Sequence, residues 1–345
     1  MSRLCYVSHC YRGLEVAGYK AKTDNEITLE EMGAVNLGLP RKYSHNAVVI
    51  FIHGVLSSLR FCFKVRKDDV VVLQYPLKKY FTFICRVAHL RGAKTVALIH
   101  DLGSFRRKKL TVAQEMKRLS HADGVIASNK VMEKWIREQG YQGHLSSLGF
   151  WDYRSSSINT HQQQVCHQPI RIAYAGSISR RKNSFLTTFA SFLEHCELHL
   201  FGWVNGMSEL EQCQHVVSHG YVQADDFIRD AEVDFGIVWD GDSMEVCSGD
   251  WGEYLHYNTP HKTSFYLRGG IPVVVWKQSA MAYMVEQTGA GVCVDSLQEL
   301  ESKLMHLSPS QYAEMKVKAL GLAEKMNHGG FVEDAVRGME RMLQR

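Results

Sequence analysis

Short runs of apolar residues alternate with helical patterns along the first half of the chain. Helical periodicity from Thr111 to Leu119 and from Lys130 to Gln139, with Gly140 after the second, predicts helices. Between such stretches, continuous apolar runs are typical of parallel strands that are covered on both faces of a sheet. The runs that predict buried strands are Val48–Ile52, Val70–Leu73, Thr95–Ile99 and Gly124–Ala127.

The alternation lapses in the middle of the chain and then starts again. Residues 153–169 are polar and aperiodic, which indicates an interdomain linker or, as the alternative, a long surface loop. Helical patterns fill most of the remaining chain, and its end reads as wholly helical. The strands predicted in this second half are Ile170–Ala175, Leu198–Phe201, Val233–Val238, Pro272–Trp276 and Gly291–Val294.

Two successive series of this kind predict an α/β fold with two doubly wound, Rossmann-like domains that face a cleft. The N-terminal domain is expected at residues 1–152, the linker at 153–169 and the C-terminal domain at 170–330. Residues 331–345 are expected to form a helix that can pack back on the N-terminal domain. Ligands of open α/β sheets bind beyond the carboxyl ends of strands, so residues that follow strands are the candidates for chemistry.

The composition agrees with two ordinary soluble domains. The chain has 345 residues, of which 45% are hydrophobic and 22% are charged. A net charge of +4 is too weak to argue for nucleic acid as a partner. It suits a phosphate-bearing ligand, or loose contact with an anionic membrane surface.

Cysteine usage and hydropathy favour a cytoplasmic protein. Nine cysteines are scattered singly without a C-x-x-C pair, which argues against a disulfide framework or a zinc site. The N-terminus lacks the apolar stretch and the cleavage site of a signal peptide. The most apolar long window, Val70–Leu90, is interrupted by Lys78, Lys79 and Arg86, so no membrane span is expected.

The segment from Tyr174 to Asn183 follows a predicted strand and precedes a helix. Gly176 permits a tight turn with close backbone approach, and the helix N-terminus favours an anion. Three cations follow, and this arrangement suits a diphosphate; they are Arg180, Arg181 and Lys182. The segment is neither a Walker loop nor a complete G-x-G-x-x-G motif, which disfavours an ATPase or a dehydrogenase. The alternative is a turn glycine beside a solvated basic face.

A second candidate segment runs from Tyr257 to Val275. Asn258 or Thr259 can cap a helix that has Pro260 in its first turn and ends at Gly269-Gly270. Three polar side chains then lie near the positive end of the helix; they are His261, Lys262 and Ser264. In this position Lys262 can pair with phosphate, and Asn258 can bond a ligand oxygen. The alternative is a well-capped structural helix with a surface lysine.

These residues carry a resemblance to a known family. Asn258–Pro272 is similar to the N-x-P-H-K-x-x-x-Y-L-x-x-G-x-P-V segment of a bacterial family of two-domain (GT-B type) sugar transferases. That family includes galactofuranosyltransferases of cell-surface polysaccharide and glucosyltransferases that act on adhesin glycans. The resemblance spans nearly the whole chain. Its other segments are 17–21 with Asp24, 98–102, and 236–241.

The resemblance implies a role for individual residues. Arg180, Arg181 or Lys182 would meet the donor diphosphate, and Asn258 and Lys262 would hold the diphosphate or the ribose. Asp240 would lie on the cleft wall near the donor. Gly18 and Lys20, in the loop after the first strand, would approach the donor from the N-terminal domain. Tyr19 departs from the pattern, because the family more often has a small residue there.

Asp240-Gly241-Asp242 forms a D-x-D triplet after a strand, a pattern that can hold Mg²⁺ or Mn²⁺ and a donor diphosphate. Because basic residues elsewhere can neutralise a departing UDP, we expect a metal-independent reaction that needs no other cofactor.

Inversion of the anomeric carbon requires a base that deprotonates the acceptor hydroxyl. Asp101 is the first candidate and His100 the second, since both follow a predicted strand. The alternative is a capping aspartate beside a buried histidine.

The densest charge cluster of the chain is Arg106-Arg107-Lys108-Lys109, between Phe105 and Leu110. It predicts peripheral contact with anionic lipid at the inner face of the cell membrane, which would bring the enzyme to a lipid-linked acceptor. A solvated helix start is the alternative.

The combined interpretation is a glycosyltransferase that moves a hexose, galactofuranose or glucose, from a UDP-sugar to a sugar acceptor in cell-surface polysaccharide or glycan synthesis. An enzyme resembling NDP-sugar epimerases and a non-enzymatic nucleotide-sugar-binding module are the alternatives. Whether the chain forms a homo-oligomer stays open.

Overall fold

Two compact units make up the chain in the computed structural model, which describes residues 3–13, 17–77, 80–105, 108–161 and 163–344. Unit 1 comprises Met1–Asp152 and His328–Arg345, and unit 2 comprises Tyr153–Asn327. The expected linker, 153–169, is irregular in structure and makes its contacts with unit 2. For example, Thr160 donates its backbone N–H to the carbonyl of Arg229. The chain returns to unit 1 at His328, a little earlier than the expected boundary at residue 330.

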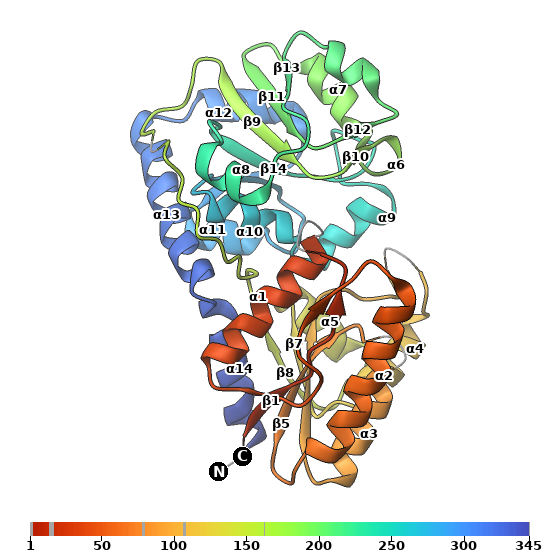
Figure 1. Ribbon diagram of the computed structural model, residues 1–345. Coiled ribbons are helices and arrows are strands. Elements are labelled where there is room, and N and C mark those ends of the chain that lie inside the picture. The colour runs from red at the N-terminus through yellow and green to blue at the C-terminus, as the bar shows by residue number, and fades with distance from the viewer. Residues whose placement is uncertain (1–2, 14–16, 78–79, 106–107, 162, 345) are drawn as a thin grey trace. The chain divides into compact units, whose positions relative to one another are not determined.

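Unit 1 is built on a parallel sheet that has six strands within the described residues, in the order β3-β1-β5-β6-β7-β8. Helices α1 and α14 cover one face of this sheet, and α2, α3 and α4 cover the other (Figure 1). The strands of the sheet are β1 (Leu4–Tyr6), β3 (Val35–Asn36), β5 (Val70–Tyr75), β6 (Lys94–Ile99), β7 (Gly124–Ala127) and β8 (His144–Ser147), and a separate parallel pair is formed by β2 (Cys10–Tyr11) and β4 (Lys42–Tyr43). The helices are α1 (Ala17–Glu31), α2 (Ala47–Lys64), α3 (Phe81–Leu90), α4 (Val112–Leu119), α5 (Lys130–Glu138) and α14 (Gly330–Leu343).

One predicted strand of unit 1 is wrong, because Val48–Ile52 forms the first turns of α2. Asn46 caps this helix, and its side-chain oxygen accepts from the backbone N–H groups of Val48 and Val49. A short apolar run does not distinguish a strand from a helix by itself. Here the apolar residues continue past Ile52 at helical spacing as far as Phe63.

The most apolar long segment also differs from the expected one. Val70–Leu90 divides into β5 and α3, whereas α2 has a mean hydropathy of 1.6 over 18 residues. Among the described residues, α2 is the one helix long and apolar enough to cross a membrane by length and composition alone. Such a helix is weak evidence for a span, because a core helix of a soluble protein passes the same criterion.

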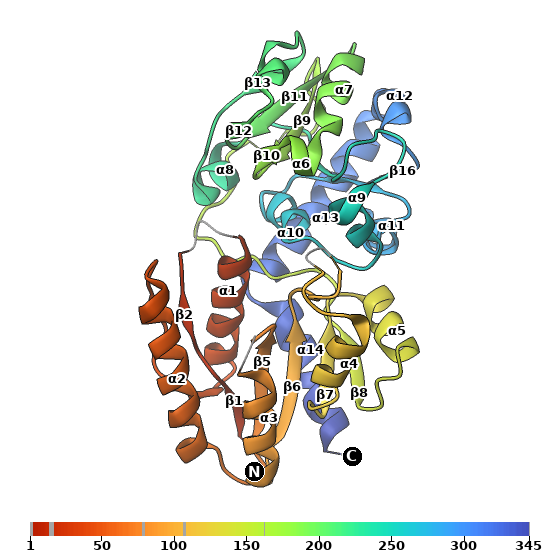
Figure 2. The same ribbon diagram turned by 90° about the vertical axis from the view of Figure 1, so that its right-hand side faces the viewer.

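Unit 2 repeats the architecture. Its parallel sheet has six strands in the described part of the chain, in the order β13-β11-β9-β14-β15-β16. Figure 2 labels β13, β11, β9 and β16 of this sheet. The strands of the sheet are β9 (Ile170–Ala175), β11 (Cys196–Phe201), β13 (Val216–Ser218), β14 (Phe235–Val238), β15 (Val273–Trp276) and β16 (Gly291–Val294), and β10 (Ile178–Ser179) pairs separately with β12 (Val204–Asn205). The helices are α6 (Arg180–Asn183), α7 (Phe185–Phe192), α8 (Ala224–Asp230), α9 (Gly249–Gly252), α10 (His261–Arg268), α11 (Ala282–Thr288), α12 (Leu300–Met305) and α13 (Pro309–Asn327), with 3₁₀ turns η1 (Ser208–Gln212), η2 (Glu253–His256) and η3 (Leu297–Glu299).

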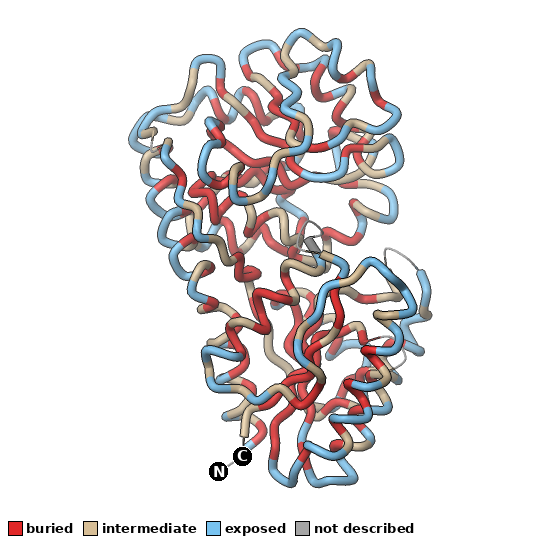
Figure 3. The backbone as a smooth tube through the Cα atoms, in the orientation of Figure 1, coloured by how far each residue is buried: buried red, intermediate tan, exposed pale blue. Residues whose placement is uncertain are grey.

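Each unit has its own hydrophobic core along its sheet (Figure 3). In unit 1 the final helix, α14, contributes Val332, Val336 and Met339 to the core. Asp152 anchors the start of that helix, because its carboxylate accepts from the backbone N–H groups of Phe331 and Val332 at 3.2 and 2.8 Å. The end of the chain is therefore an integral layer of unit 1.

Candidate active site

The strand order of unit 2 locates a ligand site before any side chain is considered. From β9 the sheet extends one way through β11 and β13, and β14 returns to the other side of β9. The carboxyl ends of β9 and β14 therefore flank a topological switch point, where open α/β sheets bind ligands. Gly176 directly follows β9, and Asp240 closely follows β14.

Four side chains from separate segments meet at this switch point. The Tyr174 hydroxyl donates to Asp240 Oδ1 at 3.0 Å. The same oxygen lies 3.5 Å from Lys182 Nζ and 4.0 Å from Lys262 Nζ. Lys262 Nζ also lies 3.7 Å from the centroid of the Tyr174 ring. Two ammonium groups thus share one carboxylate, which leaves local positive charge for an anionic ligand.

Lys262 has the most perturbed environment of the four. Only 14% of its side chain is exposed, and its Nζ has no hydrogen-bond partner among the described residues. The pKa of Lys262 is lowered to about 7, mainly by burial and then by the charge of Lys182, while Asp240 opposes the shift. A nearly buried ammonium without an acceptor is costly, so the site is suited to a ligand that supplies an anionic oxygen.

The helix that carries Lys262 begins later than predicted. Pro260 is the N-cap residue of α10, in place of the expected Asn258 or Thr259. His261 and Lys262 therefore form the first turn. Asn258 Oδ1 and Ser264 Oγ are also buried without a hydrogen-bond partner in the described chain. His261 stacks on Tyr153 at a centroid distance of 4.8 Å, which makes the imidazole part of the packing around α10.

Gly176 provides the open space beside Lys262. Its φ of 118° lies in a region that side chains rarely adopt, and a Cβ there would come within 4.0 Å of Lys262 Cε. The neighbouring β9 residue Ala175 donates its N–H to the hydroxyl of Tyr266 on α10 at 2.6 Å. This bond fixes α10 against the end of β9, so Lys262 and Gly176 are held together.

The three cations of the 180–182 run point in different directions. Lys182 reaches Asp240, and its ammonium lies 5.3 Å from the centroid of the Trp251 ring. Arg181 lies 5.9 Å from the same ring. Arg180 instead pairs with Glu209 and bonds the carbonyl of Gly206, and this exposed contact occupies its guanidinium. Lys182, with Arg181 near the same ring, therefore lies toward the switch point, whereas Arg180 is paired elsewhere.

The D-x-D triplet separates into two environments. Asp240 is surrounded by the Tyr174 hydroxyl and two lysines, as described above. Asp242 is hydrogen-bonded to Ser248, whose hydroxyl also accepts from the Asp242 N–H at 3.1 Å. Two ammonium groups beside Asp240 repel a divalent cation, whereas they attract phosphate. Asp240 is therefore better placed to orient the lysines than to ligate a metal.

The two residues of unit 1 that were expected to approach the donor are placed differently from expectation. Gly18 and Lys20 belong to helix α1 and not to a loop. Lys20 Nζ is paired with Asp24 at 2.7 Å, and both side chains are largely buried. Part of the charge of Lys20 is thus neutralised within its own helix, which weakens its case as a donor contact.

The two base candidates follow β6, as predicted. His100 is stacked on Trp151 at 4.5 Å and bonded to Gln74 at 2.9 Å, with Asn25 at 3.3 Å. The imidazole is thus fixed by packing. Asp101 is the next residue, partly exposed in irregular chain.

Unit 1 contains a further histidine that sequence reasoning missed. His9 closely follows β1, and its Nε2 is buried without a hydrogen-bond partner in the described chain. The pKa of His9 is lowered to about 3, mainly by burial and also by Lys22 and His53, so the imidazole is neutral at pH 7. Its position after a strand was the available signal. In unit 2 the missed residues are Tyr174 and Trp251, which lie beside the lysines of the switch point.

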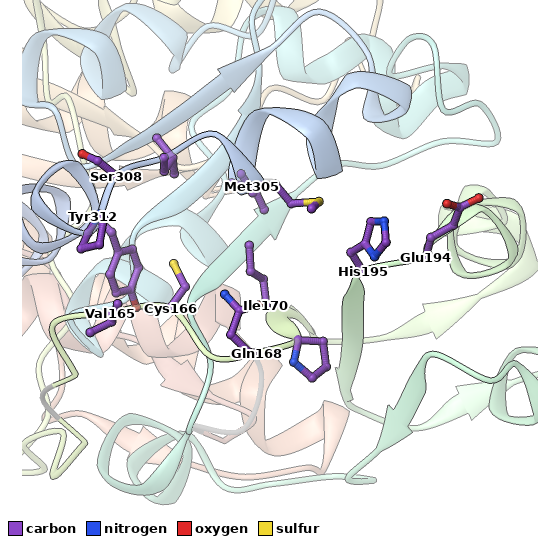
Figure 4. A pocket seen from close by; sticks show the side chains of 13 residues that line it. Val165, Cys166, Gln168, Ile170, Glu194, His195, Met305, Ser308 and Tyr312 are labelled. Carbon is purple, nitrogen blue, oxygen red and sulfur yellow. The ribbon is translucent and has the colours of Figure 1, made fainter.

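The cavity in Figure 4 lies at the amino ends of the strands of the unit 2 sheet, opposite the switch point. It has a volume of about 520 Å³ and includes Ile170, where β9 begins, and Glu194 and His195, which precede β11. Gly176 and Lys262 lie beyond the opposite end of β9. Near the cavity the buried Asp234 accepts from His167 and Tyr312, which ties the irregular segment to the sheet. We therefore interpret this region as structural.

The comparisons with known proteins identify the family. Residues 4–150 match the model of the glucosyltransferase 3-like N-terminal domain, and residues 172–339 match that of the C-terminal domain. The chain belongs to the glucosyltransferase 3-like family. It is 30% identical to the beta-1,6-galactofuranosyltransferase WbbI of Escherichia coli K12, over 93% of both chains. It is 24% identical to glucosyltransferase 3 of Streptococcus gordonii, over 81% of this chain and 80% of that protein.

Solved structures agree on the fold. The lipopolysaccharide outer core galactosyltransferase WaaB superposes with a TM-score of 0.59 at 13% identity, covering 98% of this chain and 99% of that one. The lipopolysaccharide glycosyltransferase WaaG gives 0.58 at 11% identity, covering 96% and 98%. At these identities the likeness shows the fold alone. The chain is a glycosyltransferase of GT-B fold, with a nucleotide-sugar donor and a saccharide acceptor, and the resemblance stated from its residues is confirmed.

Proposed function

We propose that this enzyme transfers a hexose from a UDP-sugar to a hydroxyl group of a saccharide, in the synthesis of a cell-surface polysaccharide or glycan. The names of its relatives make galactofuranose and glucose the two candidate hexoses. The observation that carries the proposal is Lys262, a nearly buried ammonium without a hydrogen-bond acceptor at the switch point of unit 2.

The geometry supports a diphosphate as the ligand of this lysine. Lys262 and Lys182 share Asp240, so their joint charge is only partly neutralised. Lys262 also stands in the first turn of α10, where the helix dipole favours an anion. Gly176 leaves room for a phosphate close to the backbone. The diphosphate would therefore lie beside two ammonium groups, on side chains that are both largely buried.

The same residues supply the catalytic effect. When the bond between the anomeric carbon and the diphosphate breaks, negative charge grows on the departing UDP. A cation held beside that charge stabilises the transition state more than the bound ground state. This support for the leaving group makes a metal-independent, inverting transfer the proposed mechanism, with Asp101 as the proposed base and His100 as the second candidate.

The acceptor and its location are part of the proposal. We propose that transfer takes place in the cytoplasm, at the inner face of the cell membrane, where a lipid-linked saccharide would be accessible. The cluster expected to reach lipid includes Lys108 and Lys109, while Arg106 and Arg107 lie outside the described residues.

The test is Lys262→Met, which keeps the side chain long and removes its charge. We expect calorimetric UDP binding to weaken by about tenfold or more, because charged hydrogen bonds contribute roughly 1.5–3 kcal/mol each. Turnover of the UDP-sugar should fall as well. The thermal unfolding temperature of the unliganded variant should stay the same or rise, since a costly buried charge is removed.

The matched control is Lys318→Ala on α13, an exposed lysine paired only loosely with Glu314 at 4.0 Å. It should bind UDP as the wild type does. Wild-type UDP affinity in Lys262→Met would contradict the site. Conversion of the UDP-sugar to an epimer without release of UDP would instead support the epimerase alternative.

A further inference from the structure

Helix α2 of unit 1 buries its polar side and exposes its apolar side. The side buried against unit 1 is composed mainly of small or polar residues, namely His53, Gly54, Ser57 and Ser58, together with Phe61. The side that faces outward carries large apolar residues, and Phe51 and Phe63 are 58% and 83% exposed. The exposed apolar residues of α2 are Val48, Phe51, Ile52, Leu56, Leu59 and Phe63, which we call the α2 stripe. A continuous exposed apolar stripe of this kind marks an interaction surface.

The polar side of α2 holds the helix in this orientation. Ser57 Oγ accepts from the backbone N–H of Leu39 at 3.0 Å, and the His53 ring bonds the carbonyl of Pro40 at 3.0 Å. Gly54 lets the ring of Tyr80 approach, since a Cβ there would lie 3.0 Å from the ring. These contacts keep α2 lying along the surface of unit 1. Insertion of α2 as a membrane span would break these contacts. The stripe is therefore suited to a surface that lies parallel to the axis of α2.

The apolar surface extends beyond α2. Helix α3 lies beside α2 in both views (Figures 1 and 2) and contacts it. It exposes Phe83 and, at its end, Leu90, which is 87% exposed. Tyr43, shortly before α2, is also exposed. Exposed apolar side chains therefore continue from α2 to the neighbouring helix α3 and to the segment before α2.

The charged residues of α2 and α3 are all basic. No aspartate or glutamate occurs from Met32 to Lys67, or from Val70 to His100. Of the two intervening acids, Asp68 is exposed beside Lys67, and the buried Asp69 is paired with Arg3. The exposed basic residues on and beside the two helices are Lys42, Arg60, Lys64, Arg66, Lys67, Arg86 and Arg91. An apolar stripe with a cationic fringe is the pattern of an interfacial helix on an anionic leaflet.

We propose that the α2 stripe inserts into an anionic lipid leaflet, with α2 lying in the plane of the membrane and the basic fringe contacting the headgroups. A second copy of this chain fits the face less well, because an isologous interface would bring two mainly basic surfaces together, and neither α2 nor α3 carries a carboxylate. This proposal concerns unit 1 alone and does not depend on which donor unit 2 binds.

The experiment is co-sedimentation of the full chain with lipid vesicles. We expect the wild type to bind vesicles of phosphatidylcholine mixed with phosphatidylglycerol, and to bind pure phosphatidylcholine vesicles much more weakly. Phe51→Glu/Phe63→Glu should lower binding to the mixed vesicles by about tenfold or more, since each buried phenylalanine contributes at least that factor. Arg60→Gln/Lys64→Gln should weaken binding to the mixed vesicles and reduce its salt dependence.

The matched control is Val317→Glu, which introduces the same charge at an exposed apolar position of α13 in unit 2. It should sediment like the wild type. UDP binding measured without vesicles should be equal in all these variants. This control distinguishes a variant that has lost only its lipid-binding surface from a variant that is unfolded.

Two results would overturn the proposal. One is equal vesicle binding by the wild type and Phe51→Glu/Phe63→Glu, or no vesicle binding by the wild type. The other is a wild-type oligomer in analytical ultracentrifugation that the double variant converts to a monomer, without any effect of lipid. That outcome would assign the stripe to a second copy of the chain.

Discussion

At the scale of single residues, the site is organised around one costly group. Lys262 has a buried ammonium whose pKa is lowered to about 7, mainly by burial and then by the charge of Lys182. Such a buried charge lowers the stability of the protein without ligand. Binding of an anion that pairs with the charge is therefore more favourable. Functional sites commonly contain perturbed groups for this reason.

A pH dependence follows from this lysine. Above pH 7 the unliganded protein loses the Lys262 proton, so UDP affinity should fall with rising pH, by up to tenfold per unit. Between pH 7 and the ordinary value of 10.5 the unfolded chain holds a proton that the folded chain lacks, so this residue makes the fold more stable as pH rises. As the pH rises, the affinity for UDP should therefore fall while the free energy of unfolding increases.

Isothermal calorimetry with UDP and thermal unfolding from pH 7 to 9 measure the two trends. Lys262→Arg is the matched control, because its guanidinium stays charged throughout and should give a flat profile of affinity. A wild-type affinity that is independent of pH in this range would show that Lys262 keeps an ordinary pKa or does not touch the ligand.

The base is a second prediction at this scale. Asp101→Asn should lower kcat by roughly 10²- to 10⁴-fold, the usual effect of removing a general base, while UDP affinity stays the same. Steady-state kinetics together with calorimetry separate the two quantities. His9→Gln is the comparison, since His9 is a neutral imidazole after β1 with a buried, unpartnered nitrogen. Near-normal turnover of Asp101→Asn with a large loss in His9→Gln would move the role to His9.

At the scale of elements, α14 is the feature that joins the end of the chain to its beginning. Met339 is fully buried in the core of unit 1. A Cβ on Gly124 of β7 would lie 2.5 Å from the Met339 sulfur, so a larger residue there would displace the methionine side chain. The last helix thus covers the sheet face that it shares with α1.

Met339→Ala should therefore destabilise unit 1 by about 2–5 kcal/mol, the range for truncation of a large core side chain. Urea unfolding followed by circular dichroism measures the change. Arg341→Ala, an exposed position of the same helix, should stay within about 0.5 kcal/mol of the wild type. Equal midpoints for both variants would mean that α14 is not part of the cooperative core.

At the scale of the whole molecule, two α/β units provide separate surfaces for separate tasks. Unit 2 gathers lysines around Asp240, and unit 1 carries the α2 stripe. Charge neutralisation by side chains at the donor site leads to the last prediction, that activity persists in excess EDTA. UDP release from the UDP-sugar should be the same with and without EDTA, because Lys182 and Lys262 supply the positive charge. Loss of activity in EDTA, restored by Mn²⁺, would instead assign a metal to Asp240-Gly241-Asp242.

The sequence by itself determined the central strands and the position of the helix that carries Lys262. Long apolar runs such as Thr95–Ile99 and Ile170–Ala175 became central strands, because a strand buried on both faces needs apolar residues throughout. The segment around Lys262 was also readable, since a helix after a loop and before a strand places its first turn at the ligand edge of the sheet.

Only the tertiary structure decided which residues meet. Among three consecutive cations, the packing of α6 turned Lys182 toward Asp240 and left Arg180 with Glu209. The run Val48–Ile52 became a helix with its apolar side outward, because its polar side bonds to unit 1. Local patterns encode how much of a segment is apolar and at what period, whereas contacts across many residues decide which face is covered. Tyr174, Asp240 and Lys262 are far apart in sequence, and the switch point between β9 and β14 brings them together.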